Sequence, residues 1–341
     1  MKMTIYDIAE ELKVSPATVS LALNGDRRVA EKTRLRITEF AARRGFTRNE
    51  QARNFRLRRT NNVAIVVHNI DNDFWFGVVR AVENGLGESY NVILCNTEGD
   101  LEKERKIFRN LMQRKIDGII VQPASAEESH FIESIEAGIP VVSLEETDHE
   151  LISFVKGHDF QSAYNLTGEC IRQGHRRIAF LTFRFDCIGL AERVRGFRAA
   201  AEEAGIEKNC EVITAEDLSF EAVDKVFSGR EYDFTLVLGS DDRIACRLLR
   251  VLAARKIRVP EQVSVVGWND SRFLEYLTPP LASVSIPMAK IGQKAAEIIL
   301  ANLNDGPTVL KAYVQEEIIL RESFAPVRPV RSGRENRLPE R

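Results

Sequence analysis

The sequence predicts a small all-α head followed by a larger α/β body made of two lobes. Residues 1–60 contain 14 Lys and Arg against 7 Asp and Glu, so this segment carries +7 and the other residues sum to −9 within a total of −2. Apolar residues follow helical spacing up to Gly45, and from Asn62 short β-branched runs alternate with helical stretches. The 341-residue chain is also too long for one ordinary core.

The head begins with a helix that its own side chains can cap. Thr4 and Asp7 can satisfy backbone N–H groups that have no partner inside a helix. Four apolar residues then share one helical face: Ile5, Ile8, Ala9 and Leu12. Residues 13–14 form a short turn, after which Ser15 is placed to cap a second helix with Pro16 at its first position, where a missing N–H costs nothing.

The second and third helices complete the head. Val19 and Leu23 face inward from the second helix. The residues left toward solvent are Pro16, Ala17, Ser20, Leu21 and Asn24. The third helix stops near Gly45, and its inner side carries Thr33, Ile37, Phe40 and Ala41.

Two short helices joined by so tight a turn are typical of a helix-turn-helix, whose second helix can enter the major groove of DNA. The side chains of the right size to contact phosphate are Thr4, Tyr6, Ser15, Thr18, Ser20 and Asn24. A plain three-helix bundle with polar caps is the alternative, since capping explains Ser15 and Thr4 equally well. The cationic charge of the segment favours the nucleic-acid interpretation.

The body shows two successive series of strands and helices. The first predicts strands at 63–67, 91–95, 116–121 and 141–144 and helices at 76–89, 102–114 and 127–137. The second predicts strands at 178–182, 234–238 and 263–266 and helices at 191–204 and 242–255. Two doubly wound α/β lobes follow, with a ligand site in the cleft between them, outside the carboxyl ends of the strands.

Several motifs resemble one known family along nearly the whole chain. In the head these are TIYDIA at 4–9, VSPATVS at 14–20 and LNG at 23–25. In the body they include GHRRIAFL at 174–181 and VGWND at 266–270. The chain therefore resembles the LacI/GalR family of bacterial transcription regulators. The resemblance implies a helix-turn-helix domain at 1–48, a hinge helix or linker at 49–60 and an effector domain of the type I periplasmic-binding-protein fold at 61–325.

The resemblance also assigns roles in DNA recognition. The base-reading positions are Pro16, Ala17 and Leu21, and Leu21 can offer only apolar contact, for example to a thymine methyl, where many members have Arg. In the hinge, Ala52, Arg53 and Phe55 would enter the minor groove, with Phe55 as the apolar wedge that kinks the duplex. A buried anchor against the body is the alternative for Phe55.

The lobes exchange segments in this family. The first lobe would comprise about 61–157 plus 287–316 and the second about 158–286 plus 317–325. Residues 326–341, rich in Pro and Arg, are expected to form a disordered tail.

The resemblance places the effector among six residues: Phe74, Trp75, His158, Asp159, Arg193 and Asp242. An aromatic ring can stack on a sugar face, while Arg and a carboxylate can each bind neighbouring hydroxyls. The alternatives are core packing for Phe74 and Trp75 and an ion pair or helix cap for Arg193 and Asp242. A sugar or sugar derivative is the first expectation, although His158, which stands where Asp is usual, could favour an acidic or phosphorylated molecule.

The resulting hypothesis is a homodimeric repressor that binds double-stranded operator DNA and responds to a small-molecule effector. A cytosolic solute-binding receptor module without a DNA role is the alternative. An enzyme is disfavoured because no Walker loop, G-x-S-x-G, H-E-x-x-H or G-x-G-x-x-G occurs. Five scattered Cys argue against disulfides and zinc, and no run of about 18 apolar residues occurs. We therefore expect a soluble, cytoplasmic protein without metal, cofactor or membrane contact.

Overall fold

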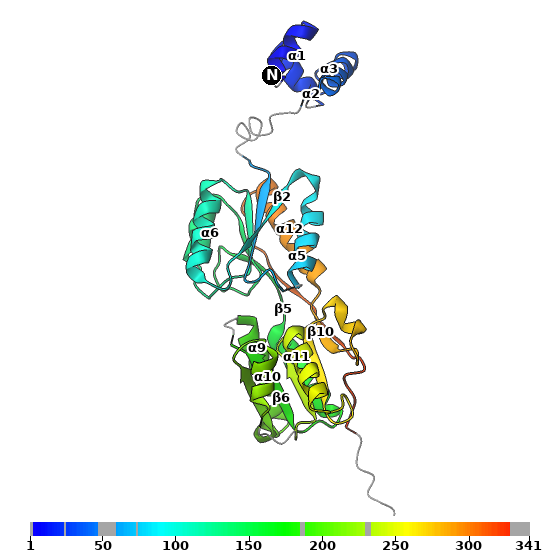
Figure 1. The fold of residues 1–341 in the computed structure, drawn as a ribbon. Helices are drawn as coiled ribbons and strands as arrows, with labels where there is room; N and C mark the ends of the chain where they lie inside the picture. The colour runs from blue at the N-terminus through cyan, green and yellow to red at the C-terminus, as the bar shows by residue number, and fades with distance from the viewer. Residues whose placement is uncertain are drawn as a thin grey trace, which may run out of the picture. The chain divides into compact units, whose positions relative to one another are not determined.

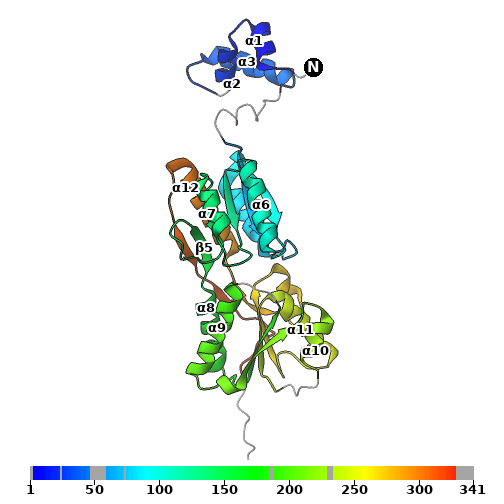
Figure 2. The same ribbon diagram turned by 90° about the vertical axis from the view of Figure 1, so that its left-hand side faces the viewer.

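The protein is described here by a computed structural model that covers residues 3–23, 25–46, 59–72, 74–184, 188–228 and 233–327 (Figures 1 and 2). The chain divides into two compact units, Met1–Thr60 and Asn61–Arg341. Most of the predicted hinge and most of the predicted tail lie outside the described residues.

The first unit is the predicted helical head. Its helices are α1 (Ile5–Leu12), α2 (Pro16–Leu23) and α3 (Glu31–Arg43). The predicted cap of α1 is present, because the Asp7 N–H donates to Thr4 Oγ1 at 3.3 Å and the Thr4 N–H donates to Asp7 Oδ2 at 2.7 Å. The three helices enclose a small core that includes Ile8, Val19 and Ile37. Side-chain caps thus begin α1 and α2, and the apolar residues of all three helices share one core.

The second unit begins with a six-stranded sheet. Its strands, in spatial order, are β11 (Lys311–Val314), β5 (Ser153–Gly157), β4 (Val141–Ser143), β3 (Gly118–Val121), β1 (Asn62–Val67) and β2 (Asn91–Asn96). All neighbouring pairs are parallel. Helices cover both faces, α5 (Phe74–Leu86) and α12 (Met288–Asp305) on one and α6 (Leu101–Gln113) and α7 (Ser129–Glu136) on the other (Figure 1).

A second sheet follows with the same plan. Its strands, in spatial order, are β12 (Glu317–Ile319), β10 (Ala282–Ser285), β9 (Ser264–Asn269), β8 (Leu236–Gly239), β6 (Ile178–Phe183) and β7 (Cys210–Ala215). Only β12 runs antiparallel to its neighbour, β10. One face carries α8 (Asp159–Arg172) and α9 (Ile188–Glu203), and the other carries α10 (Phe220–Val226) and α11 (Asp242–Ala254) (Figure 2). The predicted two-lobed α/β fold is confirmed.

Burial on both faces explains why the central strands read as apolar runs. Along β1, Val63, Ile65 and Val67 pack into the core that α5 and α12 cover. The alternate residues Ala64 and Val66 pack into the core beneath α6 and α7. Each side chain points opposite to its neighbour, so a strand covered by helices on both sides has no polar face.

Some elements were not predicted from the sequence. These are the strands β5, β7, β10, β11 and β12 and the helices α8, α10 and α12. β5 contains Lys156 and β11 begins with Lys311, so neither reads as an apolar run. Within the described ranges, no helix is both long and apolar enough to cross a membrane.

The chain passes between the two lobes three times, and these crossings position the candidate site. One lies between β5 and α8, the second between β10 and α12, and the third between β11 and β12. As a result, α12 returns to lie against α5. The carboxyl ends of strands from both sheets point toward these crossings.

Candidate functional site

The head presents its polar candidates at the start of two helices. The Ser15 hydroxyl accepts the Thr18 N–H at 3.0 Å and lies 2.8 Å from Thr18 Oγ1. Thr4 caps α1, and Tyr6 is 68% exposed on its first turn. Capping is therefore present for both Thr4 and Ser15, and it leaves their side chains at the surface of the head, where a phosphate could also reach them.

The recognition positions on α2 differ in exposure. Ala17 is exposed, while Pro16, Ser20 and Leu21 are half-buried. Leu21 also packs against the head's core, so less of it faces solvent than its helical position predicted. Asn24 and the hinge candidates Ala52, Arg53 and Phe55 lie outside the described residues.

The body holds a cavity of about 220 Å³ at the crossings between its two lobes. Four of the six predicted effector residues line it: Phe74, Trp75, Asp159 and Arg193. The segments after β1, β3 and β4 contribute His68, Gln122 and Glu145 from one lobe. The last residues of β6 and β9, Phe183 and Asn269, and Asp241 after β8 contribute from the other. The cavity therefore lies at the carboxyl ends of both sheets, as predicted for doubly wound lobes.

Two of the predicted effector residues do not line the cavity. His158 instead stacks on Tyr313, with ring centroids 4.4 Å apart. Asp242 is 1% exposed, and its two carboxylate oxygens accept from Ser283 Oγ at 2.6 Å and the Ser271 N–H at 2.7 Å. Burial raises the pKa of Asp242 to about 7, against the effect of these hydrogen bonds. Asp242 therefore joins the start of α11 to β10 and to the segment after β9.

The preceding residue takes the position that was predicted for Asp242. Asp241 lines the cavity, and its Oδ1 caps α11 by accepting the Ile244 N–H at 3.0 Å. Its Oδ2 pairs with Arg243 at 2.6 Å. The side chains of an N-cap residue and of the residue that follows it point in different directions. The prediction therefore named the neighbour of the residue that lines the cavity.

Two sets of ion pairs also line the cavity. Arg193 donates from Nε to Asp159 Oδ1 at 2.7 Å and from Nη1 to the Ser240 carbonyl at 2.8 Å. Lys156 lies 2.8 Å from Glu145 Oε2 and 3.4 Å from Asp159 Oδ2. The two carboxylates raise the pKa of Lys156, so its ammonium stays charged despite burial. Sequence inspection missed Lys156 and Glu145 because nothing local marks them as neighbours.

A further carboxyl, Glu316, lines the cavity from the crossing between β11 and β12. It is 6% exposed. Burial and the neighbouring Asp159 raise the pKa of Glu316 to about 7, while Arg193, Ser162 and Lys156 act in the opposite direction. The sequence showed no motif around this residue.

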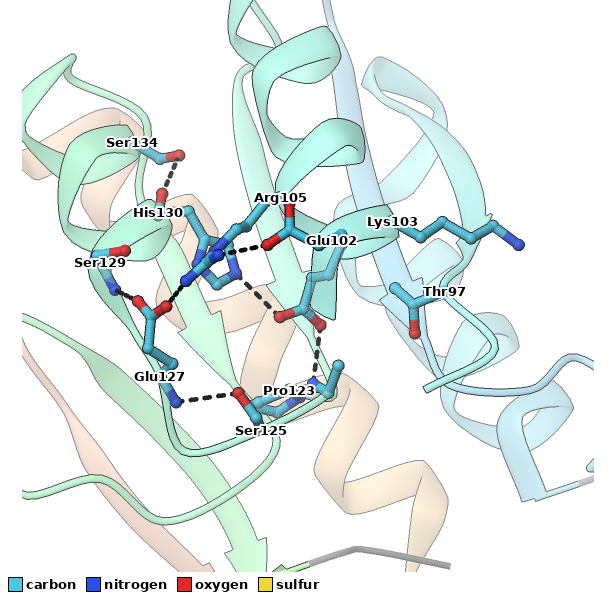
Figure 3. Close-up of polar contacts among 12 residues, drawn as sticks. Thr97, Glu102, Lys103, Arg105, Pro123, Ser125, Glu127, Ser129, His130 and Ser134 are labelled. Atoms are coloured by element: carbon cyan, nitrogen blue, oxygen red, sulfur yellow. Dashed lines mark hydrogen bonds and ion pairs between the residues drawn. The ribbon is translucent and has the colours of Figure 1, made fainter. Parts of the chain in front are cut away.

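A second polar cluster supports the cavity wall from behind. Glu104 is fully buried and accepts from His130 Nε2 at 2.9 Å and from the Ala124 N–H at 2.9 Å. Figure 3 shows His130 and its neighbours between α6, α7 and the segment that follows β3. In the same segment, the Pro123 carbonyl accepts from His68 Nε2, and burial lowers the pKa of that histidine.

The outer part of this cluster is only partly exposed. Arg105 bridges Glu102 and Glu127, as the dashed lines of Figure 3 show. Because Gln122 and Pro123 belong to the segment that Glu104 holds, the buried cluster fixes part of the cavity wall. Among the described residues, no group of three or more His, Cys, Asp or Glu side chains is arranged to hold a metal ion.

Comparison with known proteins identifies both units. Residues 4–49 match the model of bacterial regulatory proteins of the lacI family, and residues 167–324 match a periplasmic binding protein-like domain. The HTH-type transcriptional repressor PurR of Aliivibrio fischeri (strain MJ11) is 30% identical over 94% of this chain and 98% of its own length.

Two solved structures extend the comparison. A complex of the transcriptional regulator CelR with cellobiose is 26% identical, with a TM-score of 0.68 over 94% of this chain and 100% of that one. The lac repressor dimer bound to operator and the anti-inducer ONPF is 19% identical, with a TM-score of 0.85 over 95% of this chain and 99% of that one.

Proposed function

Because the chain belongs to the LacI family of bacterial regulatory proteins, we propose that it is a cytoplasmic repressor whose affinity for operator DNA depends on a small-molecule effector. The effector binds in the cavity between the lobes, and the head binds the operator. The observation that carries the proposal is the lining of the cavity by residues from both lobes, since a ligand there contacts both at once.

The regulation follows from that placement. A ligand shifts an equilibrium between two lobe arrangements only if it binds them unequally. Arg193 of α9 joins Asp159 at the crossing after β5, so a ligand that replaces or extends this pair acts directly on the crossing. We propose that residues 49–59, which lie mainly outside the described residues, transmit the change by forming or losing a helix on DNA.

A sugar or sugar derivative is the proposed effector. Arg193, Asp159 and Asn269 offer hydrogen-bonding groups on one side of the cavity. Phe74 lies edge-on to Trp75, with ring centroids 4.8 Å apart, and offers an aromatic surface. This combination suits a molecule with hydroxyls on its edges and an apolar face. The CelR relative, which binds cellobiose, supports the same class.

A homodimer is part of the proposal. The lac repressor, which has the same fold, is a dimer on its operator. A two-fold pair of heads would bind a pseudo-palindromic site. Sedimentation of the purified chain with and without operator DNA tests this, and a single head bound per operator at saturation would contradict it.

The proposed function is tested by capture of genomic DNA followed by a gel shift with and without effector. Arg193→Ala is expected to retain operator binding and lose the response to effector, because it leaves Asp159 without its closest cation. Arg195→Ala is the matched control, since Arg195 lies on the same helix and is largely exposed. Loss of operator binding in both variants would contradict a separate effector site.

The hinge assignment has its own test. Phe55→Ala is expected to lower specific operator affinity by at least about tenfold, while Phe55→Leu retains most of it, because either apolar side chain can unstack a base step. The measurement is fluorescence anisotropy with a labelled operator. Unchanged affinity in Phe55→Ala would show that Phe55 is not the wedge.

A further inference from the structure

We propose that Glu316 makes the cavity selective for an effector that carries a protonated amine, such as an amino sugar, over its neutral and phosphorylated counterparts. The inference rests on the proposed function, because it concerns the ligand of the same cavity. It narrows the ligand from sugar derivatives in general to one charge class.

Glu316 lies at a crossing between the lobes. Glu316 follows the last strand of the first sheet, β11, and precedes β12 of the second. Its carboxyl lies over Gly157, at the crossing after β5, so closely that a side chain at position 157 would require the carboxyl to move. Two of the three crossings therefore meet at this carboxyl, and a ligand group that binds it contacts both.

No described residue makes a well-formed hydrogen bond to the Glu316 carboxyl. Both of its oxygens are buried. A buried carboxyl in that state costs free energy unless something satisfies it. A ligand in the cavity is in position to do so, because Glu316 belongs to the lining.

The acidic side chains of the described lining outnumber the basic ones. Every other carboxylate of the described lining has a cation beside it: Glu145 with Lys156 at 2.8 Å, Asp159 with Arg193 at 2.7 Å, and Asp241 with Arg243 at 2.6 Å. His68 is buried with a lowered pKa and adds no positive charge. An ionised Glu316 therefore leaves the described lining with one surplus negative charge.

The surplus negative charge favours binding of a cationic ligand over a neutral or an anionic one. An amine supplies the missing cation and hydrogen-bond donors together, which makes the pair with Glu316 charge-assisted. A neutral sugar leaves the carboxyl uncompensated or requires it to stay protonated. A phosphate adds like charge in a buried site, which is strongly unfavourable. Phe74 and Phe183 supply aromatic surfaces in the same cavity, and such surfaces attract ammonium groups.

The raised pKa of Glu316, about 7, agrees with this assignment. The groups around the carboxyl are Asp159, which disfavours its ionisation, and Arg193, Lys156 and Ser162, which favour it. An added cation from the ligand would favour the ionised form further, so binding of an amine would release a proton near neutral pH.

The test is a thermal-shift and calorimetric comparison on the full chain. The probes are D-glucose, D-galactose and D-mannose, each as the parent sugar, the 2-amino sugar, its N-acetyl derivative and the 6-phosphate. We expect the amino form of one of them to bind at least about tenfold more tightly than its parent and its N-acetyl form, and the phosphate to bind most weakly. Raising the pH from about 6 to about 7.5 strengthens binding of the amine, because Glu316 ionises over this range.

Two variants assign the effect to the residue. Glu316→Gln keeps the size of the side chain and is expected to abolish both the preference for the amine and the pH dependence. Glu317→Gln is the matched control, because Glu317 is the exposed neighbour on β12. The N-acetyl and pH comparisons on the unaltered protein remain decisive if Glu316→Gln fails to fold.

The proposal is overturned if no amino sugar stabilises the protein, if a neutral or phosphorylated form binds more tightly, or if Glu316→Gln keeps the preference. Capture of specific genomic DNA is measured on the same samples. Failure of that capture contradicts the proposed regulator, whereas failure of the amine preference alone contradicts only the role of Glu316.

Discussion

The candidate residues of the head are close together in the sequence, whereas those of the cavity are far apart in it. The head's candidates lie within about twenty consecutive residues, from Thr4 to Asn24, and the described ones lie at or near the surface of short helices. The cavity collects residues from His68 to Glu316 across two lobes, and its charged side chains other than Glu316 form ion pairs. An exposed site can be inferred from local sequence, whereas a buried site depends on the topology that assembles it.

The largest expected difference between the two regions is their response to salt. Raising the salt from about 50 to about 200 mM is expected to weaken operator binding about a thousandfold or more, because several phosphate contacts each release counterions. Effector binding is expected to change only about threefold or less, since buried pairs are screened little. Anisotropy with operator DNA and calorimetry with effector measure the two slopes, and equal slopes would contradict the comparison.

A core substitution in the head tests its independence from the body. Ile8 is fully buried in the head's core, so Ile8→Ala is expected to cost about 2–5 kcal/mol of head stability and to abolish operator binding. The melting transition of the body and its effector affinity remain unchanged. Leu35→Ala, at a position 55% exposed on α3, is the control. Calorimetry that showed both units melting together would argue against independent units.

A buried polar substitution tests the support of the cavity wall. Glu104→Gln is expected to destabilise the body by about 1–3 kcal/mol, because it weakens two buried hydrogen bonds, to His130 and to the Ala124 N–H. The change corresponds to a fall in Tm of about 2–4 °C per kcal/mol. Glu102→Gln, at an exposed position on the same helix, is the control. An equal Tm in both variants would show that the Glu104 cluster does not support the body.

The smallest expected effect is a pH dependence confined to the body. Asp242 and Glu316 have folded-state pKa values of about 7, raised above their ordinary values by burial. Their contribution to stability is complete below the ordinary pKa and is lost as the pH rises through about 7. Between about pH 6 and about pH 8 the body is expected to lose on the order of 1 kcal/mol per group.

The head provides the internal control for that titration. The pKa of Asp7 is lowered and that of Asp26 is lowered to about 2 by hydrogen bonds, so neither titrates in this window. Calorimetry at several pH values separates the two transitions. A fall of the head transition, or a flat body transition in both the unaltered protein and Glu316→Gln, would contradict the assignment of the raised pKa values.

The same contrast sets how much the sequence could predict. The caps at Thr4 and Ser15, the apolar strands and the two-lobed fold follow from local spacing, and the structure has them. The short strands β10 to β12 carry little apolar signal and were missed. Lys156 lies in a strand but faces the cavity, so its role depends on where the second lobe places Asp159.

The predicted effector residues illustrate the limit. Phe74, Trp75, Asp159 and Arg193 line the cavity, but His158 and Asp242 each miss it by one position along the chain. At a helix start, adjacent side chains diverge, and only coordinates show which one enters the cavity. No sequence motif marks Glu316. Its carboxyl lies against Gly157, a residue more than a hundred positions earlier in the chain, and only the fold brings the two together.

The most direct test of the account is selection of genomic DNA fragments by the purified full chain, with and without the compound that stabilises the body. The account predicts enrichment of fragments that share one pseudo-palindrome, with an enrichment that the compound changes in the unaltered protein and not in Arg193→Ala. No enrichment over random duplex under either condition would contradict it.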